Sequence, residues 1–172
     1  MKAEKSLENA LKRWQSTFNS IKDIIMIVAI NHNIIEINAA GKNTLKKKYN
    51  RIIGEKCHDI IHNSEISIKN CPCNISIQTA REHTGEYFEN NKYYQMTAWP
   101  MIDTENNITS FVHIIKNITE QKLIEIKKEE ADKQYRILFE NAEDAIFLCD
   151  LDGNIIQSNE YMCGLLKYKK NE

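Results

Sequence analysis

Residues 14–45 read WQSTFNSIKDIIMIVAINHNIIEINAAGKNTL, and residues 135–166 read YRILFENAEDAIFLCDLDGNIIQSNEYMCGLL. The two stretches align without a gap, and Phe18, Asp23 and Asn38 fall on identical residues of the second copy. A repeat spaced by about one domain length indicates a tandem array of domains. The second copy has little room before Glu172. We therefore expect one complete module followed by the opening of another, in a piece of a longer protein.

The centre of each copy has the pattern of a β-hairpin. Asp23–Ile30 is dense in β-branched residues, which predicts a buried strand, and Asn33–Asn38 predicts the returning strand. Residues 31–33 (NHN) predict a tight turn between them. Residues 152–154 (DGN) give a stronger turn signal in the second copy, because glycine accepts a positive φ.

The rest of the first module alternates between helical and strand patterns. We predict helices over residues 39–49 and 75–81, short helical turns over residues 51–61, and strands over Gly85–Glu89, Lys92–Met101 and Ile108–Lys116. The simplest packing of this order is an α+β fold, in which short helices cover one face of a five-stranded antiparallel sheet. Asn38 and Asn159 each precede a helix, and we favour a helix N-cap over a pocket residue at both positions.

An apolar helical seam precedes each copy. Leu7, Leu11, Trp14 and Phe18 are spaced by four, three and four residues, and a similar seam leads to Tyr135. These seams predict an N-terminal helix and a linker helix between the modules. Each seam either packs on its own domain or pairs with a second copy of the same helix, which would make a homodimer through these flanking helices.

Composition narrows the functional classes. The formal net charge is −1, from 23 basic and 24 acidic residues, so no overall field favours nucleic acid or anionic lipid. The apolar run Ile24–Ile30 is far shorter than the roughly 20 residues that span a bilayer, and the charged N-terminus does not resemble a signal peptide. We expect a cytoplasmic segment without membrane contact, although its parent protein could be membrane-anchored.

These features together resemble the PAS family of sensory domains. Residues 135–168 are similar to the N-terminal half of such domains, and residues 93–122 resemble their three-stranded C-terminal part. Asn117-Ile118-Thr119-Glu120 is similar to the Asp-Ile-Thr-Glu signature that joins the sheet to an output helix, with Asn in place of Asp. The predicted organisation is an N-terminal helix (1–19), a PAS domain (20–117), a linker helix (118–140) and the start of a second PAS domain (141–172).

The resemblance implies a signalling function. Such domains bind a small ligand in a concave pocket and usually belong to sensor histidine kinases and cyclic-dinucleotide enzymes. We therefore expect a sensor that passes a signal through its C-terminal helix to a downstream output domain in the same polypeptide. The alternative is a PAS module that only dimerises, with a pocket filled by its own side chains. The chain has no glycine-rich phosphate loop and no Gly-x-Ser-x-Gly motif, so we expect no catalysis by this chain.

Residues 54–74 concentrate thiols and imidazoles. Cys57, His62, Cys71 and Cys73 predict a zinc or iron–sulfur site, with His58 as an alternative ligand. Some PAS sensors resemble this segment, with a Cys-x4-His followed downstream by Cys-Pro. Ile68 stands where those relatives have a second cysteine.

Three other interpretations of these residues remain open. One is a thiol–disulfide switch between Cys57 and either Cys71 or Cys73. Another is packed thiols beside a surface histidine. The third is haem bound through a lone histidine such as His83 or His113, which is the weakest because a lone histidine is more often a core or surface residue.

Overall fold

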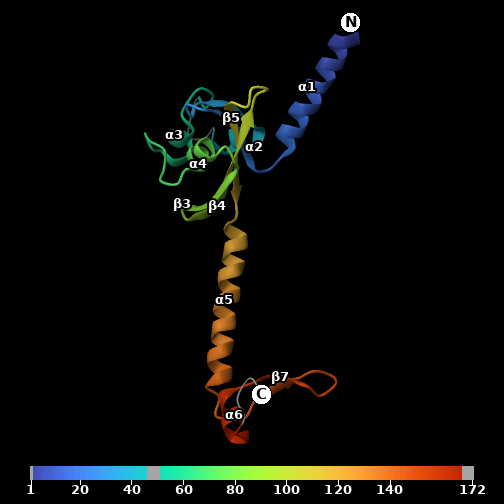
Figure 1. The fold of residues 1–172 in the computed structure, drawn as a ribbon, viewed down its shortest axis with the longest axis vertical. Helices are drawn as coiled ribbons and strands as arrows, with labels where there is room; N and C mark the ends of the chain where they lie inside the picture. Colours follow the sequence, from blue (N-terminus) through green and yellow to red (C-terminus); the bar gives the residue numbers. More distant parts are fainter. Residues whose placement is uncertain (1, 46–50, 168–172) are drawn as a thin grey trace. The chain divides into compact units, whose positions relative to one another are not determined.

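The fold comes from a computed structural model that describes residues 2–45 and 51–167 (Figure 1). Its elements are α1 (Lys2–Ser20), β1 (Ile24–Ala29), β2 (Ile34–Ile37), α2 (Ala39–Leu45), α3 (Cys57–His62), α4 (Pro72–Thr79), β3 (His83–Glu89), β4 (Lys92–Ile102), β5 (Ile108–Asn117), α5 (Thr119–Glu140), β6 (Phe147–Cys149), β7 (Ile155–Ser158) and α6 (Glu160–Leu166). The chain divides into two compact units, one reaching to Thr119 and the other starting at Glu120, and each is described by itself.

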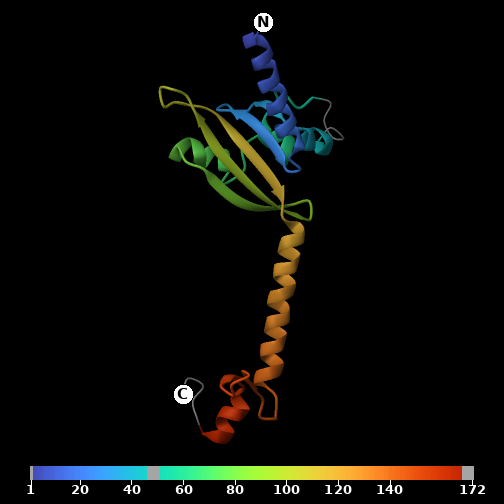
Figure 2. The same ribbon diagram turned by 90° about the vertical axis from the view of Figure 1, so that its right-hand side faces the viewer.

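The first unit contains an antiparallel five-stranded sheet in the order β2-β1-β5-β4-β3. The α+β fold predicted from the sequence is therefore confirmed. The connection from β2 to β3 carries α2, α3 and α4. Helix α4 packs on β3, β4 and β5, and α2 packs on β1 (Figures 1 and 2). This arrangement makes β5, the last strand of the unit, the centre of the sheet.

Alternating side chains of the strands form the core of this unit. The core cluster contains Met26, Val28, Ile34, Ile37, Met96 and Ile115 from the sheet, together with Ile52, Cys57 and Ile60. Helix α2 approaches the sheet very closely at Gly41, where a Cβ atom would lie 2.5 Å from Ile37 Cγ1. Only glycine permits this approach without a shift of the isoleucine.

Helix α4 differs from the prediction at both ends, running from Pro72 to Thr79 instead of over residues 75–81. Helix α4 begins at Pro72 instead of Ile75, because proline suits the first turn of a helix, where its missing N–H has no intrahelical partner. Helix α2 is described to Leu45, and the predicted continuation to Tyr49 lies outside the described residues. Residues 51–61 contain the predicted helical turn as α3.

The second unit repeats the opening of the first. Strands β6 and β7 form an antiparallel hairpin, and Asn159 caps α6. His32 and Gly153 occupy equivalent turn positions and both have positive φ, 69° and 88°. Across residues 2–45 and 51–167, no helix combines the length and the apolar character that crossing a bilayer requires.

Candidate functional site

A backbone contact brings the β1–β2 turn beside the start of α3. The amide of Cys57 donates to His32 O at 2.9 Å, and Asn33 and Lys56 form an antiparallel bridge. These bonds hold the side chains of His32 and Cys57 together, with 3.7 Å between Nδ1 and Sγ. Cys57 is 3% exposed, so its thiol is shielded from solvent.

Helix α3 adds a second imidazole next to Cys57. The His58 ring lies edge-on to the His32 ring, with 5.6 Å between the centroids. His58 Nε2 donates to Glu65 O at 3.1 Å, whereas its Nδ1 is buried and has no hydrogen-bond partner among residues 2–45 and 51–167. One ligand atom from each of His32, Cys57 and His58 lies within 4.8 Å of the other two.

The beginning of α4 supplies two more thiols. Cys71 is the N-cap residue of α4, and Cys73 lies in its first turn; both are buried against Ala98 of β4. The Cys73 thiol lies near the thiols of both Cys57 and Cys71 and perturbs the pKa of each. The three cysteines, Cys57 on α3 and Cys71 and Cys73 at the start of α4, therefore lie near one another inside the first unit.

The sheet contributes a histidine that the sequence did not connect with these thiols. His113 of β5 pairs with Met26 of β1 on one side and with Ala98 of β4 on the other. It is 2% exposed, and both of its ring nitrogens are without hydrogen-bond partners. We call the set of six residues the thiol–imidazole cluster; its members are His32, Cys57, His58, Cys71, Cys73 and His113.

The thiols of the cluster polarise one another. Hydrogen bonds with Cys73 lower the pKa of Cys57 and of Cys71, and the same contacts raise the pKa of Cys73. The hydrogen bond to Cys57 raises the pKa of His32. Burial lowers the pKa of His113 to about 4, which keeps this ring neutral at physiological pH. The cluster thus combines thiol and imidazole side chains, the two kinds of donor that thiophilic transition metals prefer.

The structure brings together most of the residues predicted from the sequence, and it separates one of them. Cys57, Cys71, Cys73 and the alternative ligand His58 belong to the cluster. His62 lies elsewhere, because its Nδ1 pairs with Glu89 Oε1 of β3 at 2.5 Å. The metal ligand set stays a prediction, and the geometry offers His32 and His113 as imidazoles that sequence spacing did not indicate. The sequence contains no local signal for His32, because its turn lies beside α3 only in the folded chain.

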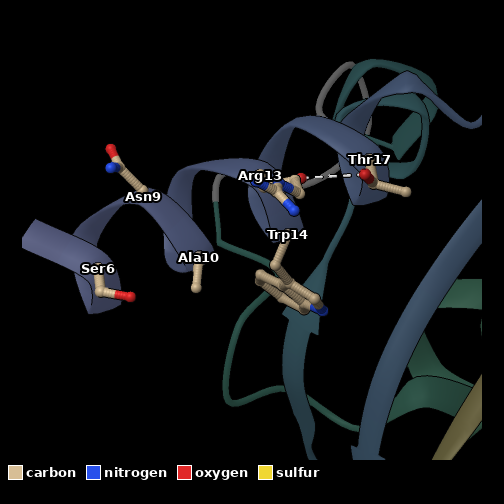
Figure 3. Close-up of a pocket in the computed structure, with 6 residues that line it drawn as sticks. All are labelled: Ser6, Asn9, Ala10, Arg13, Trp14 and Thr17. Carbon is tan, nitrogen blue, oxygen red and sulfur yellow. Dashed lines mark hydrogen bonds between the residues drawn. The ribbon is translucent and has the colours of Figure 1, made fainter.

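The first unit also contains hollows away from the thiol–imidazole cluster. A cavity of about 160 Å³ lies among α2, α3 and the sheet, and its walls include Leu45, Ile60 and Tyr94. Ligand pockets usually measure about 300–1,000 Å³, so this cavity is small. Figure 3 shows a hollow along α1 whose lining residues all come from that one helix, which makes it a surface feature and not an enclosed site.

Comparison with known proteins establishes the family. A family model described as PAS domain matches residues 22–120, and a second PAS-domain model matches residues 133–172. The chain belongs to the PAS family. Sporulation kinase E of Bacillus subtilis (strain 168) is 33% identical over 69 residues, which cover 40% of this chain and 9% of that kinase. The chain thus spans only a small part of the length of this relative.

Solved structures share the PAS fold at low sequence identity. The PAS domain of BvgS from Bordetella pertussis has a TM-score of 0.50 and 12% identity, covering 74% of this chain and 98% of that one. An RNA-binding Light-Oxygen-Voltage receptor has a TM-score of 0.56 and 12% identity, covering 74% and 37%. Identities this low establish the fold alone. From its family, the chain is a PAS signalling module.

Proposed function

We propose that this PAS module senses a redox or metal state at the thiol–imidazole cluster and relays it through α5 to an output domain in the same polypeptide. One observation carries the proposal: His113 of β5, the strand that leads into α5, is buried close enough to Cys57 for each to shift the pKa of the other. His113 of β5 lies between Met26 and Ala98 in the middle of the sheet. A change in the cluster would therefore act on the strand that precedes the output helix.

The junction between β5 and α5 supports such a relay because it is short and hydrogen-bonded. Only Ile118 separates the last residue of β5 from the first residue of α5. Ile118 N donates to Tyr93 O of β4 at 2.9 Å, and Tyr93 N donates to Thr119 Oγ1 at 2.9 Å. Thr119 Oγ1 also donates to Asn117 Oδ1 at 2.6 Å. A displacement of β5 relative to β4 would change these bonds and hence the start of the helix.

A histidine kinase is the output domain that we propose. The likeness to sporulation kinase E favours it, although this likeness involves only 9% of that protein. In this proposal the sensor works in the cytoplasm and catalysis belongs to the output domain. The chain itself would supply the ligand site and the mechanical connection.

Hydrogen exchange of the 172-residue chain tests the proposal. Exchange at residues 113–122 is measured by mass spectrometry in three states: reduced with chelator, loaded with zinc, and oxidised with diamide. We expect at least one treatment to change exchange there in the unmodified chain and in the control Cys149→Ser, whose cysteine is exposed in the second unit. The double variant Cys57→Ser/Cys73→Ser should lose the change. Identical exchange in all three states of the unmodified chain would refute sensing at the cluster.

A second candidate function is dimerisation without sensing. The seam of α1 supports it, because Leu7 is 72% exposed and Leu11 is 53% exposed. Trp14 and Phe18 stack on the same helix with 5.0 Å between ring centroids. A second copy of α1 is the partner that this spacing suits, since identical apolar stripes can pack against each other.

Sedimentation analysis separates the two candidates. The variant Leu7→Glu/Leu11→Glu should convert a dimer into a monomer, whereas Glu8→Gln, which changes the charge of the same helix next to the seam, should leave the dimer intact. A dimer that depends on Leu7 and Leu11, combined with unchanged exchange at residues 113–122 in every state, would favour the interaction module over the sensor.

A further inference from the structure

We propose that His32, Cys57, His58 and Cys73 form a four-coordinate site for a divalent transition metal, with zinc as the ion that the donor set suits best. The inference deepens the proposed function. The metal acts as a signal only if the proposed function holds. The inference also replaces the ligand set expected from sequence spacing, because His62 and Cys71 are left out and His32 is included.

Distance is the first support for this site. One donor atom each from His32, Cys57 and His58 lies within 4.8 Å of the other two. Zinc–nitrogen bonds of about 2.0–2.1 Å and zinc–sulfur bonds of about 2.3 Å put neighbouring ligand atoms of a tetrahedron roughly 3.3–3.8 Å apart. The Cys57 Sγ to His32 Nδ1 distance of 3.7 Å already lies in that range. Small side-chain rotations would bring His58 to the same separation.

The protonation pattern of His58 is the second support. Glu65 O is a carbonyl and can only accept, so the 3.1 Å contact requires a hydrogen on His58 Nε2. In the neutral ring Nδ1 then carries a lone pair, and this atom is buried without any hydrogen-bond partner. Metal-binding histidines commonly donate their other N–H to a backbone carbonyl in this way, which fixes the tautomer. A buried, unpaired acceptor is costly unless something binds it.

The backbone holds the first three ligands in a fixed frame. Cys57 N donates to His32 O at 2.9 Å, and the Asn33–Lys56 bridge adds a second connection between the turn and α3. His58 follows Cys57 on α3, so its position is set by the same helix.

Cys73 completes the donor set. It lies in the first turn of α4, is fully buried, and its thiol is close enough to that of Cys57 for each to shift the pKa of the other. Its Sγ is not among the donor atoms that lie within 4.8 Å of one another, so metal binding requires its side chain to move toward His32 and His58. Two thiolates and two imidazoles are a common set for structural zinc, and they suit zinc better than magnesium or calcium, which prefer oxygen. Binding would release to solvent the protons held by the Cys57 and Cys73 thiols and by the His32 nitrogen that coordinates the metal, and no electron transfer is involved.

Cobalt and zinc titrations of the reduced chain test the site. Cobalt binding to the unmodified chain should give thiolate-to-cobalt charge-transfer absorption and the visible bands of tetrahedral Co²⁺, and zinc should displace it. His32→Asn should lower the affinity at least about tenfold, as should Cys57→Ser. Asparagine is chosen because it tolerates the positive φ of His32. His62→Gln, whose ring pairs with Glu89 away from the cluster, should keep the affinity within about threefold.

The results separate this inference from competing ones. Loss of cobalt binding in His62→Gln with retention in His32→Asn would overturn the proposed ligand set in favour of the one expected from spacing. Absence of charge-transfer absorption in the unmodified chain would overturn the metal site altogether. Circular dichroism of each metal-free variant identifies any variant that fails to fold. His32→Gln or Cys57→Ala then replaces the unfolded variant at that position.

Failure of the proposed function would look different. Zinc binding by the four predicted ligands without any change in exchange at residues 113–122 would leave the metal site intact and remove its signalling role. A change in exchange on oxidation alone, in a chain that does not bind cobalt, would remove the metal site and retain redox sensing.

Discussion

Asn38 and Asn159 occupy the same position in the two copies and make corresponding hydrogen bonds. Asn38 Oδ1 accepts from Ile25 N at 3.1 Å and from Gly41 N at 2.9 Å, and Nδ2 donates to Asp23 O at 2.8 Å. The partners of Asn159 are Ile146 N, Met162 N and Asp144 O. Each asparagine therefore caps a helix, as predicted, and also fastens the first strand of its module to that helix.

Replacing Asn38 tests this double role. Asn38→Ala should lower the free energy of unfolding by about 3 kcal/mol, because it removes a cap and leaves buried backbone groups unpaired. Urea denaturation followed by circular dichroism measures the change. Asn9→Ala on the exposed side of α1 is the control and should change stability by less than about 0.5 kcal/mol. Equal stabilities of the two variants would contradict the role assigned to Asn38.

Asp103 organises the turn between β4 and β5. Backbone amides of Asn107 and Glu105 donate to its carboxylate, and these bonds lower its pKa. Because the folded-state pKa lies below the unfolded value of about 3.9, the stabilisation is present above that pH and is lost as the pH falls through the lowered pKa. We expect the amide NMR signals of Glu105 and Asn107 to shift in this acidic window. In the variant Asp103→Asn, the amide signals of Glu105 and Asn107 should lose this common pH-dependent shift. A shift centred at or above pH 3.9 in the unmodified chain would contradict a lowered pKa of Asp103.

His113 is a buried imidazole whose nitrogens lack partners. His113→Leu should raise the free energy of unfolding of the reduced, metal-free chain by about 1 kcal/mol, because an apolar side chain of similar size avoids the cost of unpaired polar atoms. Urea denaturation with chelator present provides the measurement. Lower stability of the variant would indicate that the imidazole has a polar partner, such as a bound water.

The sequence predicted some of these residue roles and missed others for a physical reason. Asparagine before a helix is a local signal, so both caps could be predicted. His58 and His62 lie one turn apart on α3, and each contacts a different neighbour. His58 meets Glu65 O, whereas His62 meets Glu89. His32 joins the site through the hydrogen bond from Cys57 N to His32 O and the bridge between Asn33 and Lys56, which no local pattern encodes.

At the scale of elements, the junction of β5 and α5 depends on Thr119. Thr119→Val should lower the free energy of unfolding by about 1–2 kcal/mol and speed amide exchange at Ile118, because the Oγ1 bonds to Tyr93 and Asn117 are lost. Exchange mass spectrometry and urea denaturation measure the two effects. Thr104→Val, in the exposed turn after β4, is the matched control. Faster exchange throughout the sheet, and not only at the junction, would show that the variant acts by general destabilisation.

Strands were predicted more closely than helix boundaries. The alternation of β4 and the β-branched run of β1 are strong local signals, and both strands lie where the sequence placed them. The start of α4 was missed because residues 71–73 (CPC) read as loop, although proline favours the first turn of a helix. This error mattered for the site, since the helix orders Cys71 and Cys73.

The two units bury their apolar residues to different degrees. Met26 and Val28 of β1 are fully buried, whereas Phe147 of β6 is 48% exposed and Ile155 of β7 is 58% exposed. We expect slow amide exchange in β1, β4 and β5 and much faster exchange in β6 and β7, because local stability follows buried apolar contacts. Exchange mass spectrometry of the whole chain measures this directly. Comparable protection in both hairpins would contradict the expectation.

The repeat predicted two modules, and the order of strand and helix patterns in the first module predicted the fold class. Neither pattern predicted which side chains meet in the first module. The thiol–imidazole cluster draws on a turn, two helices and the central strand, so it depends on long-range pairing within the sheet and on the packing of α4. Residues 54–74 indicated the chemistry, and the three-dimensional arrangement decided which imidazoles take part.

Because only Ile118 lies between β5 and α5, the start of the helix is held close to the end of the strand. Each residue added to an α-helix turns everything beyond it by about 100°. Insertions after Thr119 would therefore change the angular phase presented to an attached domain while leaving the cluster untouched. One extra residue should misalign the output, whereas seven, which nearly complete two turns, should restore it. The number of residues between the module and its output domain would then set the signalling output, and insertions or deletions in the gene could change it.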